Sequence, residues 1–168
     1  MRRVHILIIL MLSFFIIFSG CDRGKNNKRK MAEYREMVRS TGNVIMKQAS
    51  GCFSQFKSYV TAWEYAKVTG TDFHAAVDEI LGERNERLKE EMRKNRWAIH
   101  EIMVKLRDSP PELIDCYKKL DELYGIYLEI HSLAMNPSEA MENFDALIND
   151  LQSRLEEKKK ELDEFLIH

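Results

Sequence analysis

The chain carries three thiols, at Cys21, Cys52 and Cys116, and these side chains offer the widest choice of chemistry. A thiol in suitable surroundings can accept a lipid, form a disulfide, bind a metal or act as a nucleophile. Cys21 follows a long apolar segment, whereas the other two lie where apolar residues recur every three or four positions. A free cysteine in such a stripe behaves as a small hydrophobic side chain. We therefore expect modification at Cys21 and a packing role for Cys52 and Cys116.

A disulfide between Cys52 and Cys116 is the alternative, since an exported domain meets oxidising conditions. If successive helices run up and down, the two cysteines lie roughly 18 Å apart along the helix axes. A disulfide needs Cα atoms within about 7 Å of each other. A break in the first helix would bring the two thiols closer, so pairing stays open at this point.

The histidines and carboxylates form no recognisable metal, haem or catalytic motif. Di-iron helical bundles need Glu-x-x-His on one helix face, but the residues three positions before the four histidines of the body are Thr71, Trp97, Leu128 and Phe165. The sequence also lacks a Cys-x-x-Cys-His haem site, a Gly-x-Ser-x-Gly elbow and a P-loop. We expect no metal, no other cofactor and no enzymatic activity. An enzyme whose site has no familiar motif stays an alternative.

The charge balance excludes one class of partner. The chain has 26 basic and 27 acidic residues, and without its first 20 residues, which hold Arg2 and Arg3, it has 24 against 27. A nucleic-acid-binding domain would show a strong excess of basic residues. We therefore expect no nucleic-acid partner.

The first 20 residues have the layout of a secretory signal peptide. A basic start, Met1-Arg2-Arg3, precedes an apolar run from Val4 to Phe18, and small residues follow. As a helix, this run of about 15 residues would reach about 22 Å, which is less than the ~30 Å hydrocarbon core of a bilayer. Cleavage of residues 1–20 is therefore expected in preference to a permanent membrane span.

The end of this segment, Phe18-Ser19-Gly20-Cys21, resembles the lipobox of bacterial lipoproteins. In that family the cysteine thiol is diacylglycerated, the signal is cut directly before it, and the new N-terminus is usually acylated, with chains such as palmitate. The usual pattern has Leu, Val or Ile where this chain has Phe18. The resemblance covers residues 1–21 only. It implies a lipid on Cys21 that holds the protein at a cell membrane, on the extracytoplasmic side.

The residues after Cys21 are polar and highly charged, and we expect residues 21–30 to form a flexible tether. Their basic side chains favour the alternative that Cys21 ends an uncleaved anchor, because the positive-inside bias would resist export of this end. On a lipidated protein they could instead rest on anionic headgroups at about 1 kcal/mol each. Asp22 resembles the inner-membrane retention signal of enterobacterial lipoproteins. Whether the membrane is inner or outer stays open.

Residues 31–168 show a helical period throughout, so we expect one all-α domain. Gly70 ends a first stretch of about 31–69, and Thr71 or Asp72 caps a second that runs to about 108. Ser109-Pro110-Pro111-Glu112 predicts a capping box at the start of a third, which runs to about 135, and Asn136-Pro137-Ser138-Glu139 predicts the same for a fourth, which runs to about 166. Gly42 suggests a bend near residues 40–43, and Lys158 interrupts the apolar stripe of the last stretch. Short connections make successive helices antiparallel neighbours. The prediction is an up-down antiparallel bundle of about four long amphipathic helices.

The third stretch is apolar nearly all round between Leu123 and Met135. One interpretation is a central helix covered by the other three, with Gly125 allowing a close neighbour. The other is a docking surface, rich in Tyr and Met, that includes Tyr124, Tyr127 and Met135.

The function expected from these features is a membrane-anchored envelope lipoprotein whose helical domain is a non-enzymatic structural or interaction module. Its partners would be the membrane, through Cys21, and another protein or a second copy of the chain. The alternative is a carrier of a small ligand or lipid, with a cavity between the third stretch and Trp63 or Trp97.

Overall fold

The computed structural model describes residues 23–137 and 144–167. By its contacts the chain divides into two units, Met1–Lys30 and Met31–His168. The described residues form helices α2 (Arg23–Thr69), α3 (Phe73–Leu81), α4 (Glu83–Leu106), α5 (Ile114–Met135) and α6 (Phe144–Ile167), with a 3-10 turn, η2 (Pro111–Leu113), before α5. These two ranges contain no strand.

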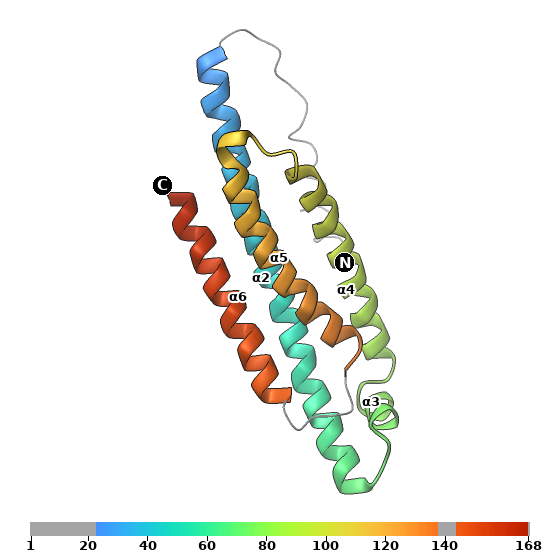
Figure 1. The fold of residues 1–168 in the computed structure, drawn as a ribbon. Helices are drawn as coiled ribbons and strands as arrows, with labels where there is room; N and C mark the ends of the chain where they lie inside the picture. Colours follow the sequence, from blue (N-terminus) through green and yellow to red (C-terminus); the bar gives the residue numbers. More distant parts are fainter. Residues whose placement is uncertain (1–22, 138–143, 168) are drawn as a thin grey trace. The chain divides into compact units, whose positions relative to one another are not determined.

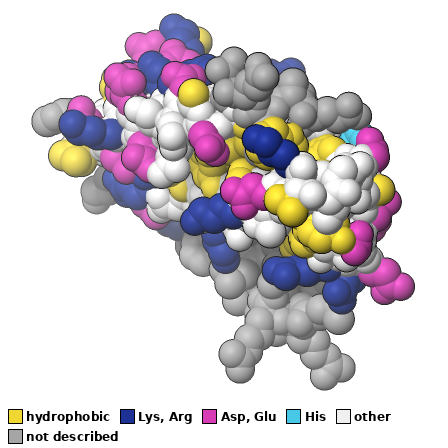
Figure 2. Space-filling model, turned by 90° about the horizontal axis from the view of Figure 1, so that it is seen from below, with side chains coloured by type: hydrophobic (Ala, Val, Ile, Leu, Met, Phe, Trp, Pro, Cys, Tyr) yellow, Lys and Arg dark blue, Asp and Glu magenta, His cyan; other side chains and the backbone are white. Residues whose placement is uncertain are grey.

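The second unit is an up-down helical bundle, as the sequence predicts. From residue 31 onward α2 runs antiparallel to α4, α4 to α5, and α5 to α6 (Figure 1). α5 lies between α4 and α6, and α2 packs beside them. On the face shown in Figure 2, Lys and Arg side chains are interspersed with Asp and Glu, and hydrophobic side chains are visible between them.

α5 is the central helix, because most of its side chains are buried among those of its neighbours. The buried members span its whole length: Cys116, Leu120, Leu123, Tyr124, Ile126, Tyr127, Ile130, His131 and Ala134. Gly125 is not the point of close approach that the sequence suggested, since a Cβ there would have no neighbour within 4 Å. That point is Gly42 on α2, where a Cβ would lie 3.0 Å from Leu162 Cδ2 on α6.

Two expectations about α2 are wrong. The helix continues through Gly42 without the expected break, and this glycine instead leaves room for Leu162 of α6. It also begins at Arg23, so the residues expected to form an unstructured tether are helical as far as the structure describes them. Lys, Arg and Asn can extend an existing helix at little cost, since only the first turn bears the nucleation penalty.

The second predicted helix is divided at Gly82. Its backbone adopts φ 48°, a left-handed value that favours glycine, and α4 begins at the next residue. Upstream, Gly70 ends α2 with φ 71°. Asp72 caps α3, as expected, by accepting hydrogen bonds from the backbone N–H groups of His74 and Ala75 at 2.9 and 3.2 Å.

The predicted capping box at residues 109–112 does not form. The chain makes the 3-10 turn at Pro111 first, and neither η2 nor α5 has a side-chain cap. Ser109 instead hydrogen-bonds to the Tyr34 hydroxyl of α2. Of the predicted start of the last helix, residues 136–139, the structure describes Asn136 and Pro137, and neither is helical; the rest lies outside the described residues.

Two buried tyrosines of α2 hold the ends of other helices. The Tyr34 hydroxyl donates to the carbonyl of Leu106, the last residue of α4, at 2.8 Å. The Tyr59 hydroxyl donates to the carbonyl of Ala134, near the end of α5, at 2.9 Å. The last four carbonyls of a helix have no partner within it. Each tyrosine therefore pairs a group that would otherwise be buried without a hydrogen bond.

Lys158 interrupts the apolar stripe of α6 because it forms ion pairs with α5. Its ammonium lies 3.1 Å from Glu122 of α5, and Arg154 makes two contacts with Glu129 of α5, at 3.1 and 3.2 Å. All four side chains are at least one third exposed, so each pair adds at most about 1 kcal/mol. These pairs fix the alignment of α5 and α6 more than they stabilise it.

Replacement of Tyr59 by Phe should lower the free energy of unfolding by about 1–3 kcal/mol, because it leaves the buried Ala134 carbonyl without a donor. Urea denaturation of the full chain measures the change. Tyr65→Phe is the matched control, since its hydroxyl donates to Glu79 at an exposed site and its loss should cost about 0.5 kcal/mol or less. Equal losses for the two variants would contradict the assigned role.

Gly51→Ala should stabilise the protein by about 0.5–1 kcal/mol, because alanine favours the helix and the new Cβ would meet nothing within 4 Å. Gly42→Ala should give a smaller gain or a loss, since its Cβ would press on Leu162. The same denaturation experiment compares the two variants. A larger gain at Gly42 would show that α2 and α6 do not meet there.

Candidate functional site

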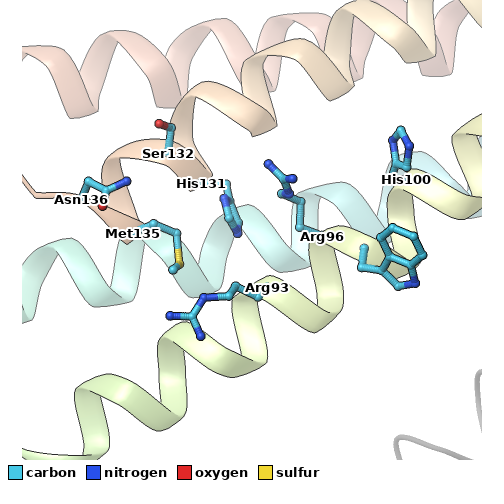
Figure 3. A pocket seen from close by; sticks show the side chains of 8 residues that line it. Arg93, Arg96, His100, His131, Ser132, Met135 and Asn136 are labelled. Carbon is cyan, nitrogen blue, oxygen red and sulfur yellow. The ribbon is translucent and has the colours of Figure 1, made fainter.

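A groove of about 520 Å³ lies between α4 and the C-terminal half of α5 (Figure 3). Its volume is in the range typical of small-ligand sites. Two groups of side chains line it: from α4 Arg93, Arg96, Trp97 and His100, and from the end of α5 His131, Ser132, Met135 and Asn136. The groove therefore combines cationic, polar and apolar groups.

The α4 side of the groove follows directly from helical spacing. Arg93, Arg96, Trp97 and His100 are separated by three or four residues, so they share one face of α4. The adjacent face of α4 carries Met92, Ile99 and Met103 into the core. Trp97 is 64% exposed, which is unusual for the largest apolar side chain, and its ring lies 6.3 Å from that of His100.

His131 is the one buried polar side chain of α5, with 5% of its surface exposed. Its ring donates a hydrogen bond to the Met92 carbonyl of α4, and its Nε2 atom has no hydrogen-bond partner. Burial lowers the pKa of His131 below 6.5, and the positive charges of Arg96 and Arg93 lower it further. The imidazole is therefore neutral at pH 7, and its second nitrogen is an unused acceptor beside the groove.

The two arginines of the groove differ in their partners. Arg93 hydrogen-bonds to Glu90 at 2.7 Å, and Lys94 shares that carboxylate. Arg96 forms no ion pair with any residue in the described part of the chain, and its guanidinium extends toward α5 near His131 (Figure 3). Its charge also acts on the Tyr124 and Tyr127 hydroxyls. Arg96 therefore supplies most of the uncompensated positive charge in the groove.

A buried polar network supports the groove from the side of α2. Gln55 Nε2 donates to Asn85 Oδ1 at 3.0 Å, and that oxygen lies 3.3 Å from the Tyr59 hydroxyl. About one turn earlier on α2, the Cys52 thiol lies 3.6 Å from the Met92 sulfur. These contacts fix the start of α4 and the turn of α4 that accepts the hydrogen bond of His131.

The cysteines described by the structure are free and buried. Burial raises the pKa of Cys52 to about 12 and also raises that of Cys116, so both remain protonated thiols at neutral pH. No disulfide joins them, and neither thiol has the lowered pKa of a reactive nucleophile. Their packing role on apolar stripes is confirmed.

The residues singled out from the sequence have different places in the structure. Cys21 lies outside the described residues. Tyr124 and Tyr127 are 8% and 1% exposed, so they offer almost no surface to a partner. Met135 is half-buried and lines the groove. The central-helix interpretation of residues 123–135 therefore agrees with the structure, and an open tyrosine face does not.

Sequence analysis missed the two arginines and the unpartnered nitrogen of His131. The spacing of the arginines, Trp97 and His100 on one helix face was available as a signal, but a charged stretch is usually only solvated surface. That His131 faces α4 could not be read from the sequence, because it depends on how α4 and α5 pack.

Two kinds of feature do not occur within residues 23–137 and 144–167. No group of three or more His, Cys, Asp or Glu side chains there is placed to hold a metal ion. In the same ranges, no helix has both the length and the apolar character needed to cross a bilayer.

Comparison with known proteins gave no match to any protein-family model, curated protein or solved structure. The groove and the N-terminal sequence are therefore the observations on which function must be argued.

Replacement of His131 by Gln should flatten the pH dependence of stability between pH 7 and 5. Unfolding restores the ordinary pKa of this histidine near 6.5. As the pH falls below that value, the unfolded chain binds a proton at this side chain while the folded chain does not. The stability contributed by neutral His131 is thus complete above pH 6.5 and declines as the pH falls toward the lowered pKa of the folded state. Urea midpoints at several pH values measure this slope.

The groups around His131 identify the source of the effect. Arg93 and Arg96 face it from α4 and Tyr127 from α5, while the nearby α2 residues Cys52 and Tyr59 have raised pKa values and stay neutral in this range. His100→Gln, at an exposed ring, is the control and should keep the wild-type slope. An unchanged slope in His131→Gln would contradict burial of the neutral ring.

Proposed function

We propose that this protein is a lipid-anchored component of the bacterial cell envelope whose helical domain is a non-enzymatic binding module. The single observation that carries the anchor is the sequence Phe18-Ser19-Gly20-Cys21 at the end of a signal-like segment. Two or three acyl chains, at about 0.8 kcal/mol per buried methylene, hold a protein on a bilayer far more firmly than one chain does. The domain would then act on the extracytoplasmic side of the membrane.

The basic residues next to the anchor support a position close to the bilayer. Lys28, Arg29 and Lys30 have exposed side chains in the first part of α2. Near an anionic membrane surface each basic side chain contributes about 1 kcal/mol of attraction, and this falls off within a Debye length. Such a cluster adds to the hold of the acyl chains and keeps the start of α2 at the headgroups.

The surface of α4 supports a binding role for the domain. Trp97 is exposed between two arginines and His100, and Trp and Arg are the side chains most enriched where partners bind. A protein partner or a second copy of the chain could use this face.

A second candidate function is a carrier of a small ligand or lipid. It is favoured by the groove, which lies between α5 and Trp97 and has the volume of a small-ligand site. Trp63, the other tryptophan considered for such a cavity, does not line it.

Mass analysis of the protein purified from cell membranes tests the anchor. The native chain should begin at Cys21 and carry the added mass of acyl chains. Cys21→Ser should show no acyl mass and should keep residues 1–20, since the cut belongs with the lipid-modified cysteine in the family that this segment resembles. Cys52→Ser, which changes a buried thiol, should keep the lipid. A native protein without lipid and with its first 20 residues attached would exclude the proposal.

A further inference from the structure

The groove between α4 and α5 receives two guanidinium groups. Arg96 and Arg93 reach it from α4, and Asn136 lines it just after the end of α5, whereas the Ser132 hydroxyl points away from α4. A carboxylate has two oxygens that can accept hydrogen bonds from these donors, whereas a phosphate has three or four. We propose that the groove binds the phosphate group of an organic phosphate monoester, whose apolar part lies against Trp97 and Met135.

The positive charge of Arg96 favours an anion in the groove. The Arg96 guanidinium lies near two buried tyrosine rings and a neutral imidazole, and no described carboxylate pairs with it. Guanidinium groups bind phosphate through two parallel hydrogen bonds that are stronger than those between neutral groups. Arg93 contributes less, because Glu90 already neutralises part of its charge.

The Nε2 atom of His131 is unpaired and closed to solvent, so a ligand in the groove must displace neighbouring atoms to contact it. Once contacted, this nitrogen selects phosphate over carboxylate. A buried nitrogen without a partner is costly, and this one is an acceptor because the other ring nitrogen donates to Met92. A phosphate monoester has its second pKa near 6, so its monoanion keeps an O–H that can donate to Nε2. At pH 6 about half of the monoester is still the monoanion, whereas a carboxylic acid with a pKa near 4 has lost almost all of its protons and has nothing to donate.

The C-terminal end of α5 disfavours an anion nearby, but two of its backbone carbonyls already accept hydrogen bonds. The C-terminus of a helix carries partial negative charge. The Ser132 carbonyl accepts the Asn136 N–H at 3.0 Å, and the Ala134 carbonyl accepts the Tyr59 hydroxyl. The opposing field is therefore smaller than that of a free helix end.

Phosphate monoesters could reach the groove from two sources, a soluble ester or a lipid headgroup such as that of phosphatidic acid. Trp97 and Met135 would contact the organic part in either case. This inference depends on the proposed function only in treating the domain as a binding module. Lipidation at Cys21 is measured separately, so failure of one does not imply failure of the other.

Isothermal titration of the full chain in a non-ionic detergent at pH 6 tests the site. Phenyl phosphate should bind with a Kd of about 1 mM or lower. Phenylacetate, with a carboxylate, and benzyl alcohol, without charge, should bind at least about tenfold more weakly. Inorganic phosphate should also bind more weakly, because it has no part to contact Trp97. Absence of phenyl phosphate binding, or equal binding of phenylacetate, would overturn the assignment.

Arg96→Gln should weaken phenyl phosphate binding by about tenfold or more, the effect of losing a charged hydrogen-bonding partner. Arg87→Gln is the matched control, since Arg87 is an exposed arginine of the same helix that does not line the groove. Equal effects of the two changes would indicate general charge attraction and exclude a site. Thermal unfolding followed by circular dichroism confirms that both variants fold.

The pH dependence of binding gives a readout specific to His131. Binding of phenyl phosphate should weaken as the pH rises from 6 to 8, because the dianion has no proton to donate to Nε2. His131→Gln should remove most of this dependence while retaining the contribution of Arg96. A dependence that is unchanged in His131→Gln would exclude the proposed contact.

Competition against phenyl phosphate distinguishes the two sources. Glycerol 3-phosphate represents the soluble esters, and dioctanoyl phosphatidic acid represents the lipid. Stronger competition by the lipid supports a headgroup ligand, and stronger competition by the ester supports a soluble one. If neither competes, the groove does not take phosphate monoesters as a class, and the proposal fails.

Discussion

The hydrogen bond from the buried Tyr59 hydroxyl to the Ala134 carbonyl is the interaction on which the candidate site most depends. It joins α2 to the end of α5, and the adjacent Gln55–Asn85 pair joins α2 to the start of α4. Inside a protein such polar groups are costly when unpaired, so a satisfied network tolerates few other arrangements of the helices. The groove lies between the two helices that this network positions.

Most polar contacts between the helices pair one group with another. Tyr34 and Tyr59 pair carbonyls at two helix ends, and Lys158 pairs carboxylates between α5 and α6. At the groove, the buried Nε2 of His131 has no hydrogen bond, and the exposed Arg96 has no ion pair among the described residues. A buried polar atom without a partner calls for an explanation, and a bound ligand is one.

The glycines show why local sequence rules predict some positions and fail at others. Gly70 ends a helix at a positive φ, and the sequence predicts it because the apolar stripe stops there. Gly82 does the same between α3 and α4, but the apolar and charged residues around it continue a helical period that conceals the break. Gly42 suggests a bend to local reasoning, whereas its real role is to admit Leu162 from a helix 120 residues later.

The sequence by itself determined the helical class, the up-down order and a helix start at Thr71 or Asp72, because period and capping are local patterns. The resemblance at Cys21 is likewise read from adjacent residues. Tertiary structure alone decided that Tyr124 and Tyr127 are buried, that α4 begins after Gly82, and that Arg96 meets His131. The physical reason is that burial and side-chain pairing depend on which helix faces cover one another. An apolar stripe shows only that one face of a helix will be buried. Which segment covers that face is decided by packing between parts of the chain that are distant in sequence.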